Sequence, residues 1–242
     1  MLKVTSASGF GSGPVGGRAD MSEAPQSGLL IHSRADTDVS TATGVDDWGN
    51  SAGANWLQGT TSRQPAYDAT ATAGSLDGAG VITFDGSSDG MQSLANNGSN
   101  TQCHWFLVIK QISWTNYDAF LESTGGSASQ VKQYSSTPNI AVAGDAATVA
   151  GTSFTIGTWY LLDVVWDGGT SNWHVNKNNG TPTTGSGGNS GWSTHVTLGA
   201  TNGSASAWAN FDIAEILAYS SEQTSTPLAN IQNYINDQYG LW

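Results

Sequence analysis

The chain has little positive charge, one cysteine and no long apolar run, and each shortage excludes a class of protein. Its 242 residues contain 7 Lys and Arg against 19 Asp and Glu, so that the formal net charge is −12. Binding to nucleic acid or to an anionic membrane needs a cationic surface. This balance of charges excludes binding to nucleic acid and disfavours binding to anionic membranes. No apolar run approaches the roughly 18 residues of a membrane-spanning helix.

The start of the chain also lacks the apolar core of a signal peptide, because polar, glycine-rich sequence follows residues 1–4. We therefore expect a protein made in a cytoplasm and not exported by the general secretion pathway. The single cysteine, Cys103, cannot form a disulfide within the chain. A hydrophobic core must provide the stability instead, and a chain of this length can bury one.

The abundant residues are those of a β protein. Charged residues make up only 11% of the chain, whereas it contains 31 glycines and 10 tryptophans. In residues 103–112 nearly every position is apolar, which predicts a strand covered on both faces. A second such run, residues 159–166, ends in Asp167-Gly168-Gly169, a hairpin signal. Strands separated by turn signals, without a βαβ rhythm, predict an all-β antiparallel sandwich or jelly roll.

Only the C-terminal end has helical periodicity. Thr226 can cap the N-terminus of a helix, with Pro227 at its first position, and Gly240 suits the position just beyond its end. This short helix should pack against the sandwich through one apolar stripe, formed by Leu228, Ile231, Ile235 and Tyr239.

Residues 1–27 are predicted to form a separate arm, and residues 28–242 the jelly-roll domain. The arm is rich in glycine, shows neither the helical nor the strand periodicity of apolar residues, and has too little apolar surface to form a core. One interpretation is a flexible terminus. The other is an anchor on a neighbouring surface, with Phe10 and Val15 as its apolar contacts.

The segment 80–91 combines a strand with a polar turn. Asp85, Ser87 and Asp89 are spaced like the first ligands of a calcium loop, and they are the candidate metal ligands of this chain. Such a loop needs a bidentate carboxylate at its twelfth position, where this chain has Asn96. The alternative is a turn that joins two strands without metal. No other cofactor is expected.

Four motifs together resemble a known family. They are Asp47-Trp48 before Ser51-Ala52-Gly53, the segments 63–67 and 82–89, and the segment 213–219 followed by the helix that ends in Tyr239-Gly240-Leu241. In this order they resemble the laminin-G-like, concanavalin A-like jelly-roll domains of bacterial and phage proteins, over residues 28–242. The resemblance implies two opposed, curved antiparallel sheets. It leaves the function open, because this fold hosts lectins, glycosidases, adhesins and virion proteins.

No catalytic constellation is evident. The chain has neither a Gly-x-Ser-x-Gly elbow nor a His-Glu-x-x-His motif. The catalytic variant that the resemblance suggests is a retaining β-glucanase, which carries Glu-x-Asp-x-x-Glu on one strand. The nearest candidates for such carboxylates here are Asp212 and Glu215. They are three residues apart, so they should face opposite sides of a strand. We expect no enzyme activity. The histidines lie in four separate segments, at His32, His104, His174 and His195.

Two functions remain open. The first is a structural virion protein of a phage, made in the host cytoplasm. It would be a capsid decoration (cement) protein anchored in part by its arm on a major capsid protein or on further copies of itself, or else a tail or fibre component. The alternative is a lectin-like module that binds a carbohydrate or a receptor. Tryptophans near turns would contact the glycan or protein partner: Trp56, Trp114, Trp173, Trp192 and Trp208.

Overall fold

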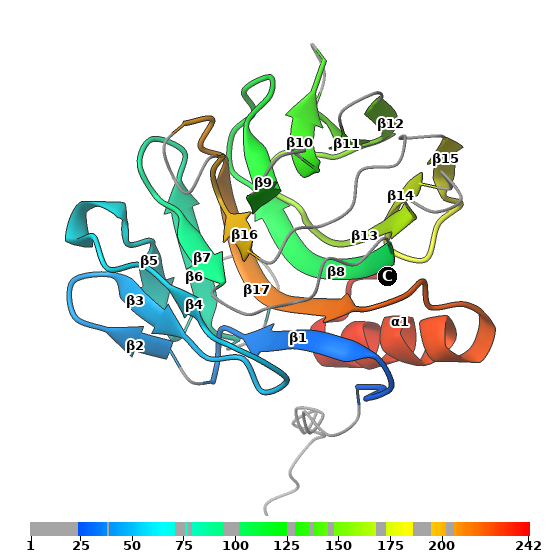
Figure 1. Ribbon diagram of the computed structural model, residues 1–242, viewed down its shortest axis with the longest axis horizontal. Coiled ribbons are helices and arrows are strands. Elements are labelled where there is room, and N and C mark those ends of the chain that lie inside the picture. Colours follow the sequence, from blue (N-terminus) through cyan, green and yellow to red (C-terminus); the bar gives the residue numbers. More distant parts are fainter. Residues whose placement is uncertain are drawn as a thin grey trace, which may run out of the picture.

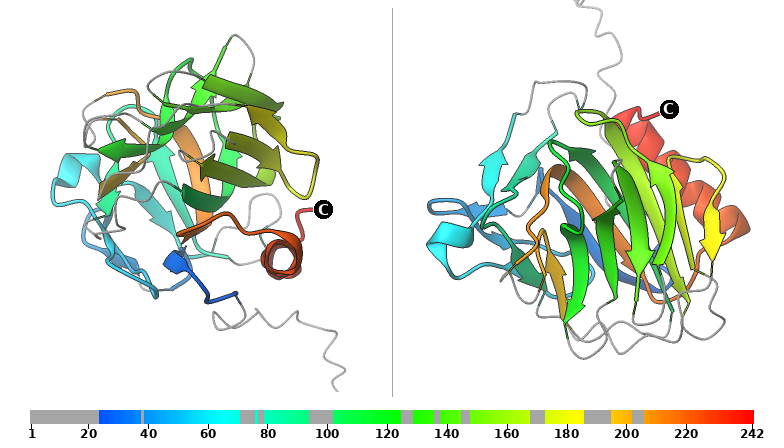
Figure 2. Two further views of the ribbon diagram at one scale, coloured as in Figure 1. Left: turned by 45° about the vertical axis from the view of Figure 1, so that its right-hand side comes forward. Right: turned by 90° about the horizontal axis from the view of Figure 1, so that it is seen from above.

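A computed structural model shows two antiparallel β-sheets packed face to face, with one helix on the outside of one sheet (Figure 1). Figure 2 shows from two further sides how the sheets oppose each other. The predicted all-β sandwich with a C-terminal helix is therefore confirmed. The structure describes residues 24–37, 39–70, 76, 79–93, 102–124, 129–135, 138–144, 148–167, 173–185, 195–201 and 206–242.

The first sheet, here sheet A, has eight strands, and the second, sheet B, has nine. The order in sheet A is β15 (Thr183–Gly185), β14 (Trp173–Lys177), β13 (Trp159–Asp167), β8 (Gln102–Gln111), β17 (Asn210–Tyr219), β6 (Val81–Asp85) and β5 (Ala66–Asp68), and β1 (Leu29–Arg34) also pairs with β17. The order in sheet B is β12 (Thr148–Ser153), β11 (Asn139–Ala143), β10 (Gln130–Tyr134), β9 (Ala119–Thr124), β16 (His195–Leu198), β7 (Met91–Ser93), β4 (Trp56–Leu57), β3 (Val45–Trp48) and β2 (Val39–Thr41).

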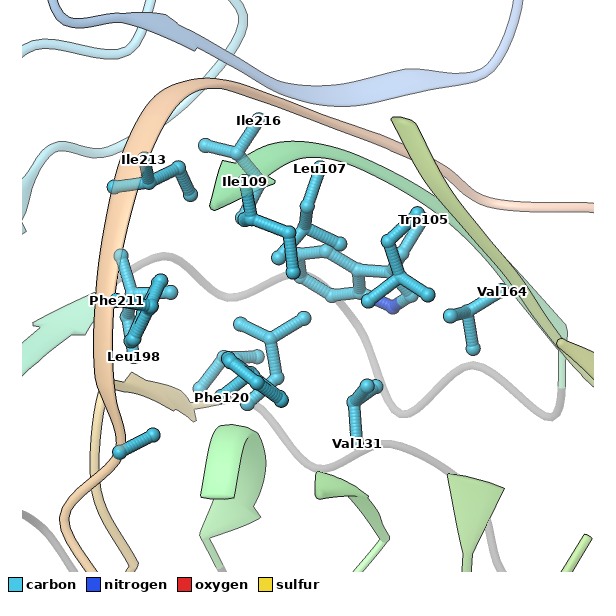
Figure 3. Packing of buried hydrophobic residues seen from close by; sticks show 14 of the residues in the cluster. Trp105, Leu107, Ile109, Phe120, Val131, Val164, Leu198, Phe211, Ile213 and Ile216 are labelled. Carbon is cyan, nitrogen blue, oxygen red and sulfur yellow. The ribbon is translucent and has the colours of Figure 1, made fainter. Parts of the chain in front are cut away.

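Sheet A is covered on both faces, as the apolar run in β8 predicts. Trp105, Leu107 and Ile109 point into the core between the sheets, where they meet residues of sheet B such as Phe120 and Val131 (Figure 3). Phe106 and Val108, which alternate with these residues, lie on the outer face of sheet A in a second apolar cluster beneath the helix. A strand buried on both faces reads as a continuous apolar run, which is why the sequence shows it so clearly.

The helix, α1 (Ser225–Tyr239), runs along the outer face of sheet A and is capped by Thr224, two residues before the predicted cap. Pro227 consequently lies in the first turn but not at the first position, and it is tolerated there because the first N–H groups of a helix have no partner within it.

Among the described residues no helix is long and apolar enough to cross a bilayer. A short 3-10 turn, Thr61–Arg63, precedes β5.

The other helix predictions are confirmed. Ile231, Ile235 and Tyr239 are buried against sheet A, and Leu228 packs at the margin of the same cluster. Gly240 adopts the left-handed conformation, with φ 62°, and its N–H donates to the carbonyl of Asn236 at 2.7 Å. This bond satisfies one of the carbonyls that a helix leaves open at its C-terminus.

The turn after β6 leads from one sheet to the other, because β6 belongs to sheet A and β7 to sheet B. It is therefore a corner of the sandwich, where the sequence predicted a turn between neighbouring strands. Gly86 lies in this corner with φ 72°, and a Cβ there would approach the Asn210 side chain to 2.6 Å. Only glycine fits both conditions without strain.

A bulge in β17 corrects one prediction. The register shifts between Ile213 and Glu215, so that Asp212 pairs with Lys110 and Glu215 with Val108. Lys110 and Val108 are two apart on β8 and share its outer face. Asp212 and Glu215 therefore lie on the same face of sheet A and not on opposite sides, because the extra residue shifts the alternation.

Candidate functional site

Two of the five predicted tryptophans are core residues. Trp56 and Trp173 have no exposed surface, and their rings pack against Trp48 and Trp166 respectively. This corrects the expectation that they contact a partner, because a ring without solvent access meets none in this conformation. Their nearness to turns in the sequence did not indicate exposure, since each occupies an inward position of its strand. Three further candidates lie outside the described residues: Phe10, Val15 and Trp192.

The other two tryptophans lie at one end of the sandwich. Trp114, in the loop from β8 to β9, and Trp208, just before β17, are both half-buried. Trp208 forms an isolated bridge with Ala119 at the start of β9, so the two segments adjoin. The most exposed aromatic residue at this end is Tyr117, with 56% of its surface accessible.

Tyr117 is held in an unusual backbone conformation. Its φ of 77° is in the left-handed region, where a bulky residue is strained. Buried Gln133 holds the loop there at three points. Its carbonyl accepts the N–H of Tyr117 at 3.0 Å, its side-chain oxygen accepts the N–H of Thr115 at 2.6 Å, and its side-chain nitrogen donates to the carbonyl of Ser113 at 3.0 Å. Strain that surrounding bonds maintain is typical of functional sites.

Tyr117, Lys132 and Tyr134 form a group that we call the Tyr117 corner. The two tyrosine rings meet edge to face at 6.2 Å, and the ammonium of Lys132 lies 5.3 Å from the centre of the Tyr117 ring. Burial lowers the pKa of Lys132, and the charge of Glu122 opposes this shift. Alternation along β10 places Lys132 and Tyr134 on the outer face of sheet B, away from the core.

Two more strained residues adjoin this corner. Among the described residues, five that are not glycine have positive φ, and Ser135 and Ala207 belong to them together with Tyr117. Ser135 follows Tyr134 directly, and the carbonyl of Ala207 accepts the N–H of Ala119 at 3.0 Å. The strain is therefore concentrated where β8, β9, β10 and β17 meet.

A row of mainly polar side chains leads away from the corner across sheet B. We call it the polar row; its members are direct cross-strand partners on β10, β9, β16, β7, β4 and β3, in the order Gln130, Glu122, Thr197, Gln92, Leu57 and Asp47. Direct partners share one face of a sheet. The neighbouring row faces the core and is entirely apolar, with Val131, Leu121, Leu198 and Met91 on the same central strands.

The middle of the polar row is deeply set. Glu122 and Thr197 are buried, whereas Gln130, Gln92 and Asp47 are half-buried. An oxygen of Glu122 accepts the side-chain N–H of Gln130 at 2.9 Å. The hydroxyl of Thr197 and one carboxylate oxygen of Asp47 are buried without a hydrogen-bond partner among the described residues. Buried polar atoms of this kind call for water or a ligand group.

A hollow of about 440 Å³ lies at the far end of the polar row. Its walls are mainly polar, and they are formed by Val39, Ser40, Asp47, Gly49, Asn50, Ser51 and Asn55. Asp47 is therefore both the last member of the polar row and part of a surface depression.

A second polar cluster lies under α1, on the outer face of sheet A. Nε2 of His104 contacts an Asp163 oxygen at 2.6 Å, and Nε2 of His174 lies 3.5 Å from the same oxygen. Nδ1 of His104 accepts the backbone N–H of Gln223 at 3.0 Å, so the ring proton must be on Nε2, which donates to Asp163. Burial acts to raise the pKa of Asp163, but His104 and His174 together hold it well below its usual range.

The residue types in this cluster are those of a metal site, and their ligand atoms lie within 4.8 Å of one another. The geometry, however, does not fit a metal ion. A histidine that binds metal through Nε2 carries its proton on Nδ1 and donates it to an acceptor. Nδ1 of His104 faces the N–H of Gln223, a donor. The cluster therefore fastens the loop before α1 to sheet A.

A third cluster holds the helix itself. Glu215 on β17 is fully buried, and its carboxylate accepts hydrogen bonds from His32 at 2.8 Å, Tyr234 at 2.9 Å and Tyr239 at 2.6 Å. Burial and the charge of Glu215 raise the pKa of Tyr239 well above its usual value. The hydroxyls of Tyr234 and Tyr239 therefore keep their protons and donate them to Glu215. These hydrogen bonds stabilise the buried carboxylate in place of water.

The predicted metal residues form a closed turn. One oxygen of Asp85 accepts the N–H groups of Ser87, Ser88 and Asp89, and the other accepts the hydroxyls of Ser87 and Ser88. An oxygen of Asp89 in turn accepts the N–H of Asp85 at 2.9 Å. Asn96 lies outside the described residues. The Asp85 carboxylate is thus used by the donors of its own turn, and calcium binding stays a prediction.

Sequence reasoning missed the Tyr117 corner and the polar row. The sequence carries no local signal for the corner, because in β10 the inward residue Gln133 is polar and the outward residue Tyr134 is aromatic, against the alternation expected of a half-buried strand. The polar row has no local signal either. Its members come from six strands spread between residues 47 and 197, and only the register brings them together.

The solved structures with similar folds include a sialidase and a domain of an arabinanase. A sialidase from Trypanosoma rangeli in complex with sialic acid matches 86% of this chain and 33% of its own, at 12% identity and a TM-score of 0.58. This chain thus spans about a third of the sialidase. Domain 4 of AbnA, a GH43 extracellular arabinanase from Geobacillus stearothermophilus in complex with arabinotriose, matches 85% of this chain and 97% of its own, at 17% identity and a TM-score of 0.57. Such identities show the shared fold alone.

No protein-family model and no curated protein matches the sequence. The structural similarities support a β-sandwich of the jelly-roll kind, as the resemblance implied. Membership of the laminin-G-like group and an origin in a phage stay predictions.

Proposed function

We propose that the protein is a carbohydrate-binding module that holds a sugar against the Tyr117 corner. The observation that carries this proposal is the exposed ring of Tyr117, kept in a strained conformation by buried Gln133. A flat aromatic face offers the apolar surface on which a sugar ring can stack. The amide, hydroxyl and carboxylate groups of the adjoining polar row offer the donors and acceptors that sugar hydroxyls require.

The arrangement around Glu122 supports binding without hydrolysis. Glycosidases use two carboxyl groups that lie roughly 5 to 10 Å apart. The cross-strand neighbours of Glu122 are Thr197 and Gln130, and neither has a carboxyl group. The similar sialidase is in complex with sialic acid and the similar arabinanase domain with arabinotriose, which supports a sugar as the class of ligand.

Replacing the stacking ring tests the proposal. We expect Tyr117→Ala to lower the affinity for a sugar identified on a broad glycan array by at least about tenfold, which corresponds to roughly 1.4 kcal/mol. Tyr117→Phe keeps the ring and should retain most of the affinity, as measured by titration calorimetry. Ile112→Ala, an exposed apolar residue of the same loop, is the matched control. An array without binding, or equal affinities for the alanine variant and the wild type, would contradict the proposal.

Capsid decoration is the second candidate function, and one observation favours it. Ala24, the first described residue, is buried in the apolar cluster beneath α1. The predicted arm therefore leaves the domain from a fixed point, as an anchor requires. Deletion of residues 1–23, which leaves Ala24 in place, should abolish incorporation into phage particles, measured by the occupancy on purified capsids. Unchanged occupancy would exclude anchoring through the arm.

A further inference from the structure

We propose that the ligand is an extended, uncharged sugar chain that lies across the strands of sheet B, from the Tyr117 corner along the polar row to the hollow at Asp47. This inference rests on the proposed carbohydrate binding and adds the class, the length and the direction of the ligand. Three features of the polar row carry it: its register, its hydrogen-bonding groups and its charge.

The register makes the row straight. Each member is the direct partner of the next, with no shift between Gln130 and Asp47, so the row runs at right angles to the strands. Its six strands span about 24 Å at the usual spacing of about 4.8 Å. This spacing is close to the length of one sugar ring in an extended chain, so each strand can present one side chain to one ring.

The hydrogen-bonding groups of the row match sugar hydroxyls. Gln130, Gln92 and Asp47 are half-buried and reach the surface, whereas Glu122 and Thr197 between them are buried. Glutamine amides both donate and accept, as hydroxyl groups do. Thr197 has no exposed surface, so the groups that a ligand can reach beyond the corner are those of Gln92 and Asp47. Hydrogen-bonding groups are therefore available to a ligand well beyond the Tyr117 corner.

The charge of the row excludes an acidic sugar. Its two ionisable members, Glu122 and Asp47, are carboxylic acids, and the whole chain carries a formal net charge of −12. The nearby cation, Lys132, is already placed over the Tyr117 ring and beside Glu122. A chain of uronic or sialic acids would meet like charges along most of the row, which costs affinity.

A series of neutral oligosaccharides of increasing length tests the inference. The probes are the linear oligomers, from disaccharide to hexasaccharide, of the neutral sugar that binds best on the array. We expect the affinity to rise with length until the chain reaches Asp47. Affinity that stops rising at the disaccharide would overturn the inference while leaving sugar binding at Tyr117 intact. An array on which no sugar binds would overturn both proposals.

Variants at the two ends locate the chain. Gln92→Ala and Asp47→Asn should each lower the affinity for the hexasaccharide several-fold and have a smaller effect on the disaccharide, whereas Tyr117→Ala should weaken both alike. Thr184→Ala, an exposed strand residue of sheet A, is the matched control and should change neither affinity. Equal effects of Gln92→Ala on both ligands would overturn the inference. An oligosaccharide of uronic acids that binds as tightly as its neutral counterpart would overturn its charge component.

Discussion

At the scale of single residues, Tyr117 combines a structural cost with a proposed function. A bulky residue in the left-handed region is destabilised by roughly 1–2 kcal/mol, whereas Asn tolerates that region. Gln133 maintains the strain through three hydrogen bonds. Residues that lower stability while serving binding are expected at functional sites, where stability and activity conflict.

Substitution of Tyr117 should therefore separate stability from binding. We expect Tyr117→Asn to raise the free energy of unfolding by up to about 1 kcal/mol, because the strain is relieved, while it removes the stacking surface. Urea unfolding measures the first effect and calorimetry with the sugar the second. A variant that loses both stability and binding would show that the conformation of Tyr117 is not strained.

Asp89 should make the stability depend on pH. Burial raises its pKa to about 6, from the value of 3.8 for the free side chain, and the charge of Asp85 adds to this effect. The protonated form is thus favoured by folding, so its contribution is fully present below about pH 4 and is lost as the pH rises through 6. The ionised carboxylate at neutral pH costs on the order of 1–3 kcal/mol.

The variant Asp89→Asn tests this pH dependence. It keeps an oxygen that can accept the N–H of Asp85 and removes the charge. We expect it to be more stable than the wild type at pH 7 and about equal to it at pH 4, in urea unfolding at both values. An equal difference at both pH values would mean that Asp89 does not titrate in this range.

At the scale of elements, α1 depends on Glu215 for its position. The carboxylate joins the helix to β17 and β1 through three hydrogen bonds from buried donors. Tyr239→Phe removes the donor to one carboxylate oxygen and leaves the ring in place. We expect a loss of about 1–3 kcal/mol in the free energy of unfolding, since the bond involves a charged acceptor.

A matched control uses another tyrosine. Tyr134→Phe removes a hydroxyl from a half-buried residue of sheet B and should change the stability by less than about 0.5 kcal/mol. A Tyr239→Phe variant as stable as this control would show that the bond to Glu215 does not hold the helix.

Elements with a local signal could be predicted from the sequence. The run in β8, the stripe of α1 and the glycine that ends it each depend on neighbouring residues, and all three are confirmed. The bulge in β17 could not be predicted from the sequence, because it appears only in the pairing with β8. The burial of Trp56 and the line of the polar row likewise result from contacts between distant segments.

At the scale of the whole molecule, the two apolar clusters share one sheet. β8 contributes Trp105 to the core and Phe106 to the cluster beneath α1. The helix cannot leave without exposing the outer face of sheet A, so we expect one cooperative unfolding transition. Tryptophan fluorescence and far-ultraviolet circular dichroism should give coincident curves in urea. Separate transitions would show that helix and sandwich unfold independently.

The pairing of β17 also has a consequence for synthesis on the ribosome. This strand forms bonds with β1, β6 and β8, which come from the first half of the chain, yet it ends at Tyr219. Until that residue leaves the ribosome, the earlier strands have open edges, which are prone to aggregate. Sheet A can therefore be completed only after β17 has been synthesised, and we expect nascent chains that end before β17 to be the ones most dependent on chaperones.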